Sequence, residues 1–166
     1  FRAPLFPAPP RAAPPTRASS PPPRPPRAGG GGPPAAAGNL TRSHLELGGK
    51  APVVVFDDAN LDAVAEGVSV AGYFNAGQDC TAATRVIAGP KVYDDVVNAL
   101  TEAAKGTKTG QPDDEDVLYG PVNNPNQLAH VSGLVERAPG HAEVTAAGRA
   151  VDGAGDLYEP TAVAGV

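Results

Sequence analysis

The sequence predicts an α/β fold with parallel strands, preceded by a disordered tail. From about residue 35 onward, short β-branched runs alternate with longer stretches in which apolar residues recur at helical spacing. Alternation of this kind is typical of a parallel sheet with helices packed against it. Residues 1–34 differ sharply, because they contain 13 of the 20 prolines, five arginines and no acidic side chain.

The proline-rich segment 1–34 is predicted to be a disordered, low-complexity tail. It has almost no large apolar side chains beyond Leu5 and two phenylalanines, so burial would not offset the entropy lost on ordering. Part of it should adopt polyproline II. The remaining 132 residues carry a net charge of −10, against +5 for the tail. This acidic balance argues against nucleic acid as a partner of the folded part.

The first predicted strand is residues 52–56, a short apolar run bounded by acidic residues. A helix should follow from Leu61, because apolar side chains then recur every three or four residues as far as Ala71. Either Asp58 or Asn60 can cap its first turn. We expect this helix to end between residues 71 and 74 and to lead into a loop that carries the only cysteine, facing a cleft.

The second half of the chain repeats the alternation. Residues 84–88 predict a second strand, and 92–106 predict a second amphipathic helix. The polar, acidic segment 107–116 predicts a loop. A third helix should begin after Asn124, which offers an N-cap ahead of a proline at the first helical position and a capping-box glutamine. Weaker strand candidates lie at residues 143–146 and 161–163.

The cysteine count and the lengths of the apolar runs indicate the expected cellular location of the protein. A single cysteine permits no internal disulfide, and no apolar run approaches the ~18 residues that a membrane helix needs. We therefore expect a cytoplasmic protein without a membrane partner. The three histidines stand in no paired ligand spacing and the cysteine has no partner cysteine, so no metal is predicted. The sequence contains no methionine, and we expect either a processed start or a fragment.

Two eight-residue stretches carry the chemistry. Residues 45–52 read LELGGKAP and residues 73–80 read YFNAGQDC, which places Glu46 34 residues ahead of Cys80. A carboxylate and a thiol suit a general base and a nucleophile. Each stretch also has a purely structural interpretation. A lone cysteine is more often a small buried hydrophobe, a Gly-Gly pair usually marks a tight turn, and Glu46 alone would be a surface carboxylate.

Together the two stretches resemble the signature motifs of the aldehyde dehydrogenase superfamily, in that family's order and spacing. The resemblance runs from about residue 35 to residue 166 and implies part of an aldehyde dehydrogenase catalytic domain. It implies that Cys80 attacks an aldehyde to give a thiohemiacetal, and that hydride transfer to NAD then leaves a thioester. Glu46 would activate the water that cleaves this thioester, and the backbone N–H of Cys80 would be one oxyanion donor. Leu47 and Gly48 are expected to contact the cofactor, and a homo-oligomer is expected for the full-length family.

Two further sequence segments indicate a particular branch of this superfamily. Residues 74–85 and 118–124 look most like bacterial γ-aminobutyraldehyde dehydrogenases, near the betaine-aldehyde branch. An aminoaldehyde such as 4-aminobutyraldehyde is therefore the expected substrate. Asp79, beside Cys80, is compatible with two roles. Its carboxylate could attract an ammonium-bearing aldehyde, although it would also disfavour the neighbouring thiolate, or it could point into a hydrogen-bond network of its own loop.

Some of the family's machinery has no counterpart in this sequence. No segment corresponds to the second oxyanion donor, an upstream asparagine, and residues 1–34 do not resemble the cofactor domain that precedes the first motif. We expect no independent dehydrogenase activity, whereas weak ester cleavage needs only nucleophile, base and oxyanion donors. The main alternative is a noncatalytic gene fragment or subunit-interaction remnant, with residues 1–34 as a frameshift product. A proline-rich docking protein is a third reading.

Overall fold

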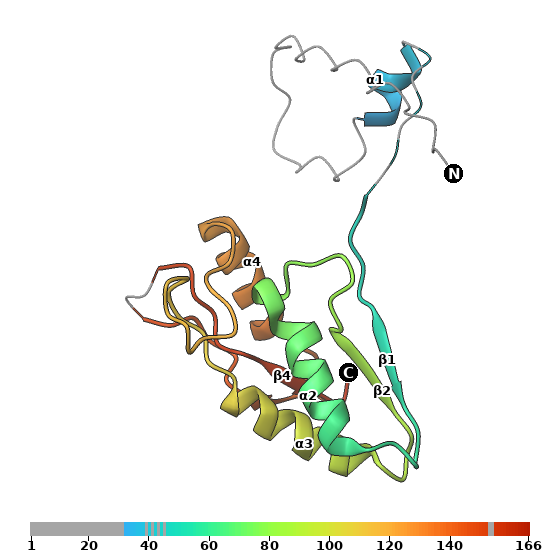
Figure 1. Ribbon diagram of the computed structural model, residues 1–166, viewed down its shortest axis with the longest axis vertical. Coiled ribbons are helices and arrows are strands. Elements are labelled where there is room, and N and C mark those ends of the chain that lie inside the picture. Colours follow the sequence, from blue (N-terminus) through green and yellow to red (C-terminus); the bar gives the residue numbers. More distant parts are fainter. Residues whose placement is uncertain (1–31, 39, 41, 43, 45, 153–154) are drawn as a thin grey trace, which may run out of the picture. The chain divides into compact units, whose positions relative to one another are not determined.

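The computed structural model describes residues 32–38, 40, 42, 44, 46–152 and 155–166, in two units, Phe1–Leu45 and Glu46–Val166. The described part of the first unit contains the helix α1 (Gly32–Gly38) (Figure 1). The sequence did not predict this helix, and its first three residues belong to the segment for which disorder was expected. Proline is tolerated in a first helical turn and alanine is the best helix former, which accounts for it. The prediction for residues 1–31 lies outside the described residues.

In the second unit, strand β1 (Pro52–Val55) pairs in parallel with β2 (Arg85–Ala88), with Val53 opposite Val86 and Val55 opposite Ala88. The parallel pairing predicted from strand–helix alternation is confirmed here. The crossover contains helix α2 (Leu61–Tyr73), whose N-cap is Asn60. The Asn60 Oδ1 accepts a hydrogen bond from Ala63 N at 3.2 Å. Of the two N-cap candidates, Asn60 is therefore the one used.

The next two helices begin where the sequence predicted. Helix α3 (Tyr93–Gly106) packs against α2 and buries Val96 and Ala104 (Figure 1). It places two aspartates in its first turn and Lys105 in its last, which complements the helix dipole. Helix α4 (Pro125–Glu136) starts at the N-cap Asn124, whose side chain accepts from Gln127 N at 3.1 Å. The loop predicted at residues 107–116 contains no helix or strand.

The last two strands lie where the two weaker candidates were expected, to within one residue, but they differ in pairing direction. β3 (Glu143–Ala146) and β4 (Ala162–Ala164) form a second two-stranded sheet that is antiparallel, with a register shift between Val144 and Ala146. Parallel strands were expected, which β1 and β2 confirm and which β3 and β4 do not. The described part of the connection between these strands contains no helix. An isolated antiparallel bridge between Ala150 and Tyr158 brings its two sides together. Such a loop reverses the chain, whereas parallel pairing requires a crossover.

An aromatic pair in the second unit connects α2 to the C-terminal segment. Tyr73, at the end of α2, stacks on Tyr119 with ring centroids 6.4 Å apart. The Tyr73 hydroxyl donates to Thr161 O at 3.1 Å, and the Tyr119 hydroxyl donates to Tyr158 O at 2.8 Å. The end of α2 is thus tied to the C-terminal segment. The buried apolar residues are Val55, Ala82, Val96, Ala104, Tyr119, Val122, Ala146, Leu157 and Tyr158.

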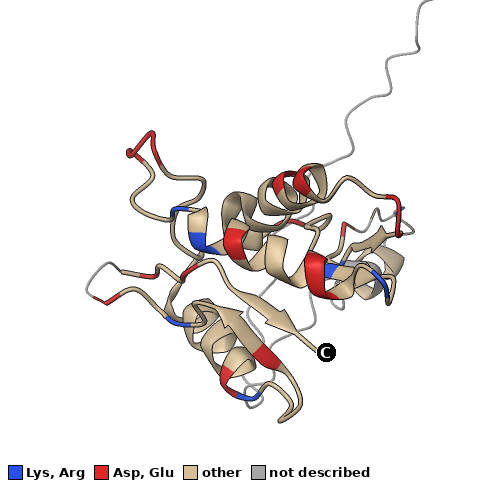
Figure 2. Ribbon diagram, turned by 90° about the horizontal axis from the view of Figure 1, so that it is seen from below, with Lys and Arg blue, Asp and Glu red and all other residues tan. Residues whose placement is uncertain are grey.

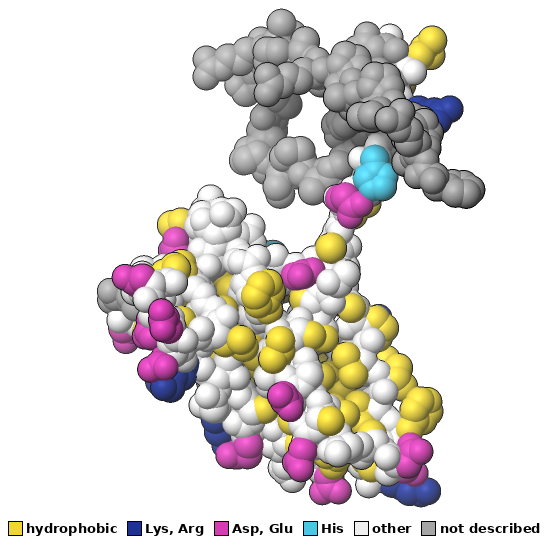
Figure 3. All heavy atoms as spheres, viewed as in Figure 1, with side chains coloured by type: hydrophobic (Ala, Val, Ile, Leu, Met, Phe, Trp, Pro, Cys, Tyr) yellow, Lys and Arg dark blue, Asp and Glu magenta, His cyan; other side chains and the backbone are white. Residues whose placement is uncertain are grey.

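The surface of this unit is acidic in some places and apolar in others. Acidic residues are spread over the helices and connecting loops (Figure 2). Apolar side chains gather over β1, β2 and α2 (Figure 3), where Val54, Phe56 and Ile87 are 55%, 70% and 50% exposed. None of the described helices is both long and apolar enough to span a membrane.

Candidate active site

The segment before Cys80 is a strained turn. Helix α2 ends at Tyr73 and is followed by η1 (Phe74–Gly77), a short 3₁₀ segment in which Asn75 and Ala76 have left-handed backbone angles, φ 52° and 56°. Gly77 continues the left-handed run with φ 70°. Asparagine and glycine adopt this conformation readily, but for an alanine it costs about 1–2 kcal/mol. The turn therefore needs support from its surroundings.

Gln78 supplies part of that support through both ends of its side-chain amide. Its Nε2 donates to Asn75 O at 2.9 Å, and its Oε1 accepts from Asn123 N at 2.7 Å. In return, the Asn75 Nδ2 donates to Gln78 O at 3.1 Å, and Gln78 N donates to Asn75 O at 3.1 Å. The turn is closed by these reciprocal bonds and is tied to the residue before the N-cap of α4.

Cys80 is exposed and lies in the turn that follows. Thr81 donates to Asp79 Oδ1 through its N–H at 2.7 Å and through its hydroxyl at 2.8 Å. The pKa of Asp79 is lowered first by the backbone bond from Thr81, then by the Thr81 hydroxyl, and to a smaller extent by the Cys80 thiol. Beyond the turn, Ala83 N donates to Ala71 O at 3.0 Å, which returns the chain to α2. The loop position predicted for Cys80 is confirmed.

These bonds bear on the two roles considered for Asp79. Its carboxylate belongs to the hydrogen-bond network of its own loop, as the second interpretation expected. The same carboxylate is exposed and ionised at ordinary pH, so it also places a negative charge beside Cys80. Both roles are therefore compatible with the geometry, and a role in substrate selection stays a prediction.

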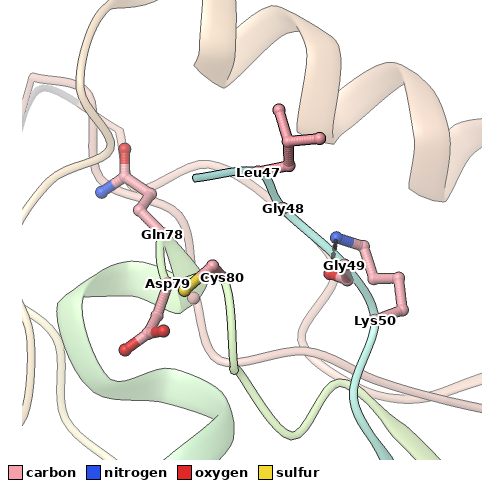
Figure 4. A pocket seen from close by; sticks show the side chains of 8 residues that line it. Leu47, Gly48, Gly49, Lys50, Gln78, Asp79 and Cys80 are labelled. Atoms are coloured by element: carbon pink, nitrogen blue, oxygen red, sulfur yellow. Dashed lines mark hydrogen bonds between the residues drawn. The ribbon is translucent and has the colours of Figure 1, made fainter. Parts of the chain in front are cut away.

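Residues 47–50 run beside this turn and complete an open hollow of about 580 Å³ (Figure 4). A Cβ added at Gly49 would lie 3.7 Å from Cys80 O, so the two backbones are in contact distance. The Lys50 Nζ donates to Gly49 O at 3.0 Å. The hollow is lined by Leu47, Gly48, Gly49, Lys50, Gly77, Gln78, Asp79 and Cys80.

The structure brings together three of the four predicted site residues. Cys80, Leu47 and Gly48 all line the hollow, whereas Glu46 is exposed and stands one residue before the lining segment. The link from Gln78 to Asn123 was not predicted. The only sequence signal for it was the glutamine inside the second motif, because its partner is a backbone N–H 45 residues away.

The surroundings of Gly48 and of the connection after β1 bear on cofactor binding. A Cβ at Gly48 would meet nothing within 4 Å, so the backbone beside Leu47 is open. A phosphate-binding site would need backbone N–H groups or basic side chains at a helix N-terminus. The connection from β1 to α2 instead presents the exposed Asp57 and Asp58. In the part of the chain that the structure describes, no cluster of three His, Cys, Asp or Glu side chains could hold a metal ion.

The chain matches the model of the aldehyde dehydrogenase family over residues 34–166. Among curated relatives, the lactaldehyde dehydrogenase of Escherichia coli is 40% identical over 127 residues, which cover 75% of this chain and 26% of the relative. A probable succinate-semialdehyde dehydrogenase [NADP(+)] of Sinorhizobium fredii is 37% identical over 131 residues, covering 76% and 26%. The chain thus spans about a quarter of the length of the curated relatives it matches.

Solved structures agree with this match. The γ-glutamyl-γ-aminobutyraldehyde dehydrogenase of Burkholderia cenocepacia superposes with a TM-score of 0.74 at 34% identity, covering 78% of this chain and 27% of that one. The betaine aldehyde dehydrogenase of Staphylococcus aureus, solved in complex with NAD⁺, superposes with a TM-score of 0.73 at 32% identity, covering the same shares. The similarity therefore extends over most of the second unit.

Proposed function

This chain belongs to the aldehyde dehydrogenase family, and from that premise we propose that it carries the nucleophile of an enzyme that oxidises an aldehyde to a carboxylic acid. The observation that supports this most directly is the hollow itself. Two motif segments separated by about 30 residues meet there, and Cys80 lies on its wall with an exposed side chain. An exposed thiol in an open hollow is accessible to an aldehyde, whereas a buried structural cysteine is not.

In the proposed reaction the Cys80 thiolate attacks the carbonyl carbon and forms a C–S bond. The carbonyl oxygen becomes an oxyanion, which the backbone N–H of Cys80 stabilises. NAD(P)⁺, when bound, would supply the acceptor for the hydride that leaves this carbon. The substrate carbon is thereby oxidised and stays attached to Cys80 as a thioester. Glu46 then takes a proton from water, the hydroxide attacks the thioester carbon, and the C–S bond breaks to release the acid and the thiolate.

We propose an aminoaldehyde such as 4-aminobutyraldehyde as the substrate. The amino-acid sequence of residues 74–85 and 118–124 supports this assignment. A relative of similar fold is also named for a γ-glutamyl derivative of that aldehyde. The exposed carboxylate of Asp79 at the edge of the hollow would attract an ammonium group. Loss of the preference for amine-bearing aldehydes on Asp79→Asn, in a full-length relative, is the expected result; an unchanged preference would exclude this role.

The proposed contacts of this chain with the cofactor are confined to the first motif. Leu47 and Gly48 could contact the nicotinamide end, and the described residues offer no cradle for the phosphates. We therefore propose that the 166 residues alone do not turn over as a dehydrogenase. We also propose NAD as the cofactor, a homo-oligomer for the complete enzyme and a cytoplasmic location.

Ester cleavage tests the proposal on the chain as it exists. With p-nitrophenyl acetate, the purified chain should release about one p-nitrophenolate per Cys80 in a fast phase, followed by slower turnover. Cys80→Ser should abolish both phases. Glu46→Gln should keep the fast phase and slow the turnover by roughly 10²-fold or more, because a general base acts only in deacylation.

A noncatalytic remnant is the competing function. One observation favours it: Glu46 lies outside the lining of the hollow. A wild-type chain that folds but releases p-nitrophenolate no faster than Cys80→Ser would support this reading and overturn the catalytic one.

A further inference from the structure

The side chain of Gln78 occupies an unusual place for an exposed glutamine. It bonds simultaneously to a strained turn on one side and to a distant loop on the other, through Nε2 to Asn75 O at 2.9 Å and through Oε1 from Asn123 N at 2.7 Å. The second bond spans 45 residues and joins the segment before Cys80 to the residue next to the N-cap of α4. A surface glutamine in solvent gains little from one fixed rotamer, so two simultaneous bonds point to a positioning role.

The turn that this amide supports is strained at its central residue, Ala76. Three successive residues, Asn75, Ala76 and Gly77, have positive φ values. Backbone strain of this kind persists only where the surroundings over-determine it. The two residues after Gln78 are Asp79 and Cys80, and the Cys80 carbonyl oxygen lies beside Gly49, 3.7 Å from where a Cβ on that residue would be. A change in the turn would therefore move the thiol and the backbone N–H of Cys80 relative to the wall of the hollow.

We propose that Gln78 is a positioning residue for Cys80: its amide braces the left-handed turn against the loop before α4 and so holds the thiol and backbone N–H where acyl transfer needs them. This inference rests on the acyl chemistry proposed above. Gln78 acts through the turn and does not itself exchange a proton or form a bond with the substrate. Its loss should affect reactions that need an aligned oxyanion donor more than reactions that need only a thiol.

Two reactions of the same cysteine separate positioning from folding. Because the chain has a single cysteine, alkylation by iodoacetamide and acylation by p-nitrophenyl acetate both report on Cys80. Alkylation develops no oxyanion, whereas acylation does. In Gln78→Ala we expect acylation to slow by up to roughly 100-fold, the cost that a misplacement of about 1 Å can have, while alkylation changes by about twofold or less.

Two further variants keep the test interpretable. Gln78→Glu retains an acceptor for Asn123 N and loses the donor to Asn75 O, so its acylation rate should fall between those of wild type and Gln78→Ala, and it serves if Gln78→Ala does not fold. Gln127→Ala removes an exposed glutamine from α4, where the backbone N–H of Gln127 makes the cap bond, and both of its rates should equal those of wild type.

Hydrogen exchange of the peptide covering residues 74–81, followed by mass spectrometry, supplies a readout that does not depend on acylation. Exchange there should be faster in Gln78→Ala than in wild type, and unchanged in Gln127→Ala. The inference would be overturned if wild type is acylated and Gln78→Ala shows the same ratio of acylation rate to alkylation rate as wild type. If wild type is alkylated but not acylated, the proposed function fails, and unchanged exchange at residues 74–81 would then overturn the positioning role as well.

Discussion

Ala76 has the least favourable backbone conformation in the nucleophile segment. Its φ of 56° places the Cβ of Ala76 close to the following carbonyl oxygen. Asn75 tolerates the same conformation because its side chain makes local hydrogen bonds, and Gly77 tolerates it because glycine has no Cβ. This conformation could not be predicted from the residue type, because alanine is a helix former and rarely adopts positive φ values. Cys80 itself was predictable from its motif, whereas the strain around it depends on bonds to residues far along the chain.

Relief of this strain is measurable. Ala76→Gly should raise the free energy of unfolding by about 1 kcal/mol. The strain of an alanine at positive φ in the folded state is larger than the free energy lost through the greater chain entropy of glycine in the unfolded state. Urea unfolding should show a higher midpoint with an unchanged slope. Ala147→Gly, at φ 48°, should shift in the same direction. Ala63→Gly inside α2 should lose about 1 kcal/mol instead, and a fall in stability for Ala76→Gly would show that its conformation is not strained.

Asp79 makes stability depend on pH in a defined direction. Its pKa in the folded chain is lowered, chiefly by the backbone bond from Thr81 and then by the Thr81 hydroxyl, whereas an unfolded aspartate titrates near ~3.9. The stabilisation by the carboxylate is therefore fully present above about pH 4 and is lost as the pH falls through the lower folded value.

Comparison with Asp79→Asn isolates the charge, because the amide oxygen can still accept from Thr81. The difference in free energy of unfolding between the two chains should be constant near neutral pH and should shrink toward zero as the solution becomes more acid. Asp113→Asn, in the exposed acidic loop, removes the same charge elsewhere and is the matched control for a general effect of net charge. A difference for Asp79→Asn that grows on acidification would contradict the assignment.

At the scale of elements, the caps of α2 and α4 carry local information that a sequence displays directly. Asn60 and Asn124 each accept from the N–H three residues on. Asn60→Ala should therefore destabilise the chain by roughly 1 kcal/mol, the usual value of an asparagine N-cap. Asn98→Ala, at an exposed position inside α3, should be neutral or slightly stabilising because alanine is the better helix former. Chemical unfolding of both variants checks this, and equal effects would argue against a capping role.

The elements that the sequence predicted are those with local causes. Helices α2 and α4 combine apolar periodicity with a cap, and β1 and β2 are short apolar runs joined by one helix. The antiparallel pairing of β3 with β4 depends instead on how the chain reverses near the bridge from Ala150 to Tyr158. That reversal has no short-range signature. Helix α1 was missed because the proline content of residues 1–34 outweighed the local run of alanines.

At the scale of the whole molecule, family membership was predictable because two motifs and their spacing survive in 166 residues. The position of Glu46 relative to the hollow was not predictable, since the motif fixes the order of residues and not where an exposed side chain points. The described second unit also holds two sheets of two strands each. Sheets of this size are marginal alone and gain stability when further surface covers them.

The uncovered face of β1 and β2 predicts self-association of the purified chain. Val54, Phe56 and Ile87 are each at least half exposed on these strands or at the end of β1, and contiguous apolar surface beside unpaired strand edges drives association at micromolar concentrations. In sedimentation experiments the average mass should rise with concentration from on the order of 10 μM. Phe56→Lys should lower this tendency, because a buried lysine in the contact would lose its hydration.

The matched control is Leu134→Lys, which adds the same charge at a similarly exposed leucine on α4. If general charge repulsion governs association, the two variants will dissociate equally, and the face of β1 and β2 loses its special role. If the strand face governs it, only Phe56→Lys will remain closer to a monomer. Because neither residue touches the hollow around Cys80, alkylation of the thiol should proceed at the wild-type rate in both variants, which separates a change in assembly from a change in the site.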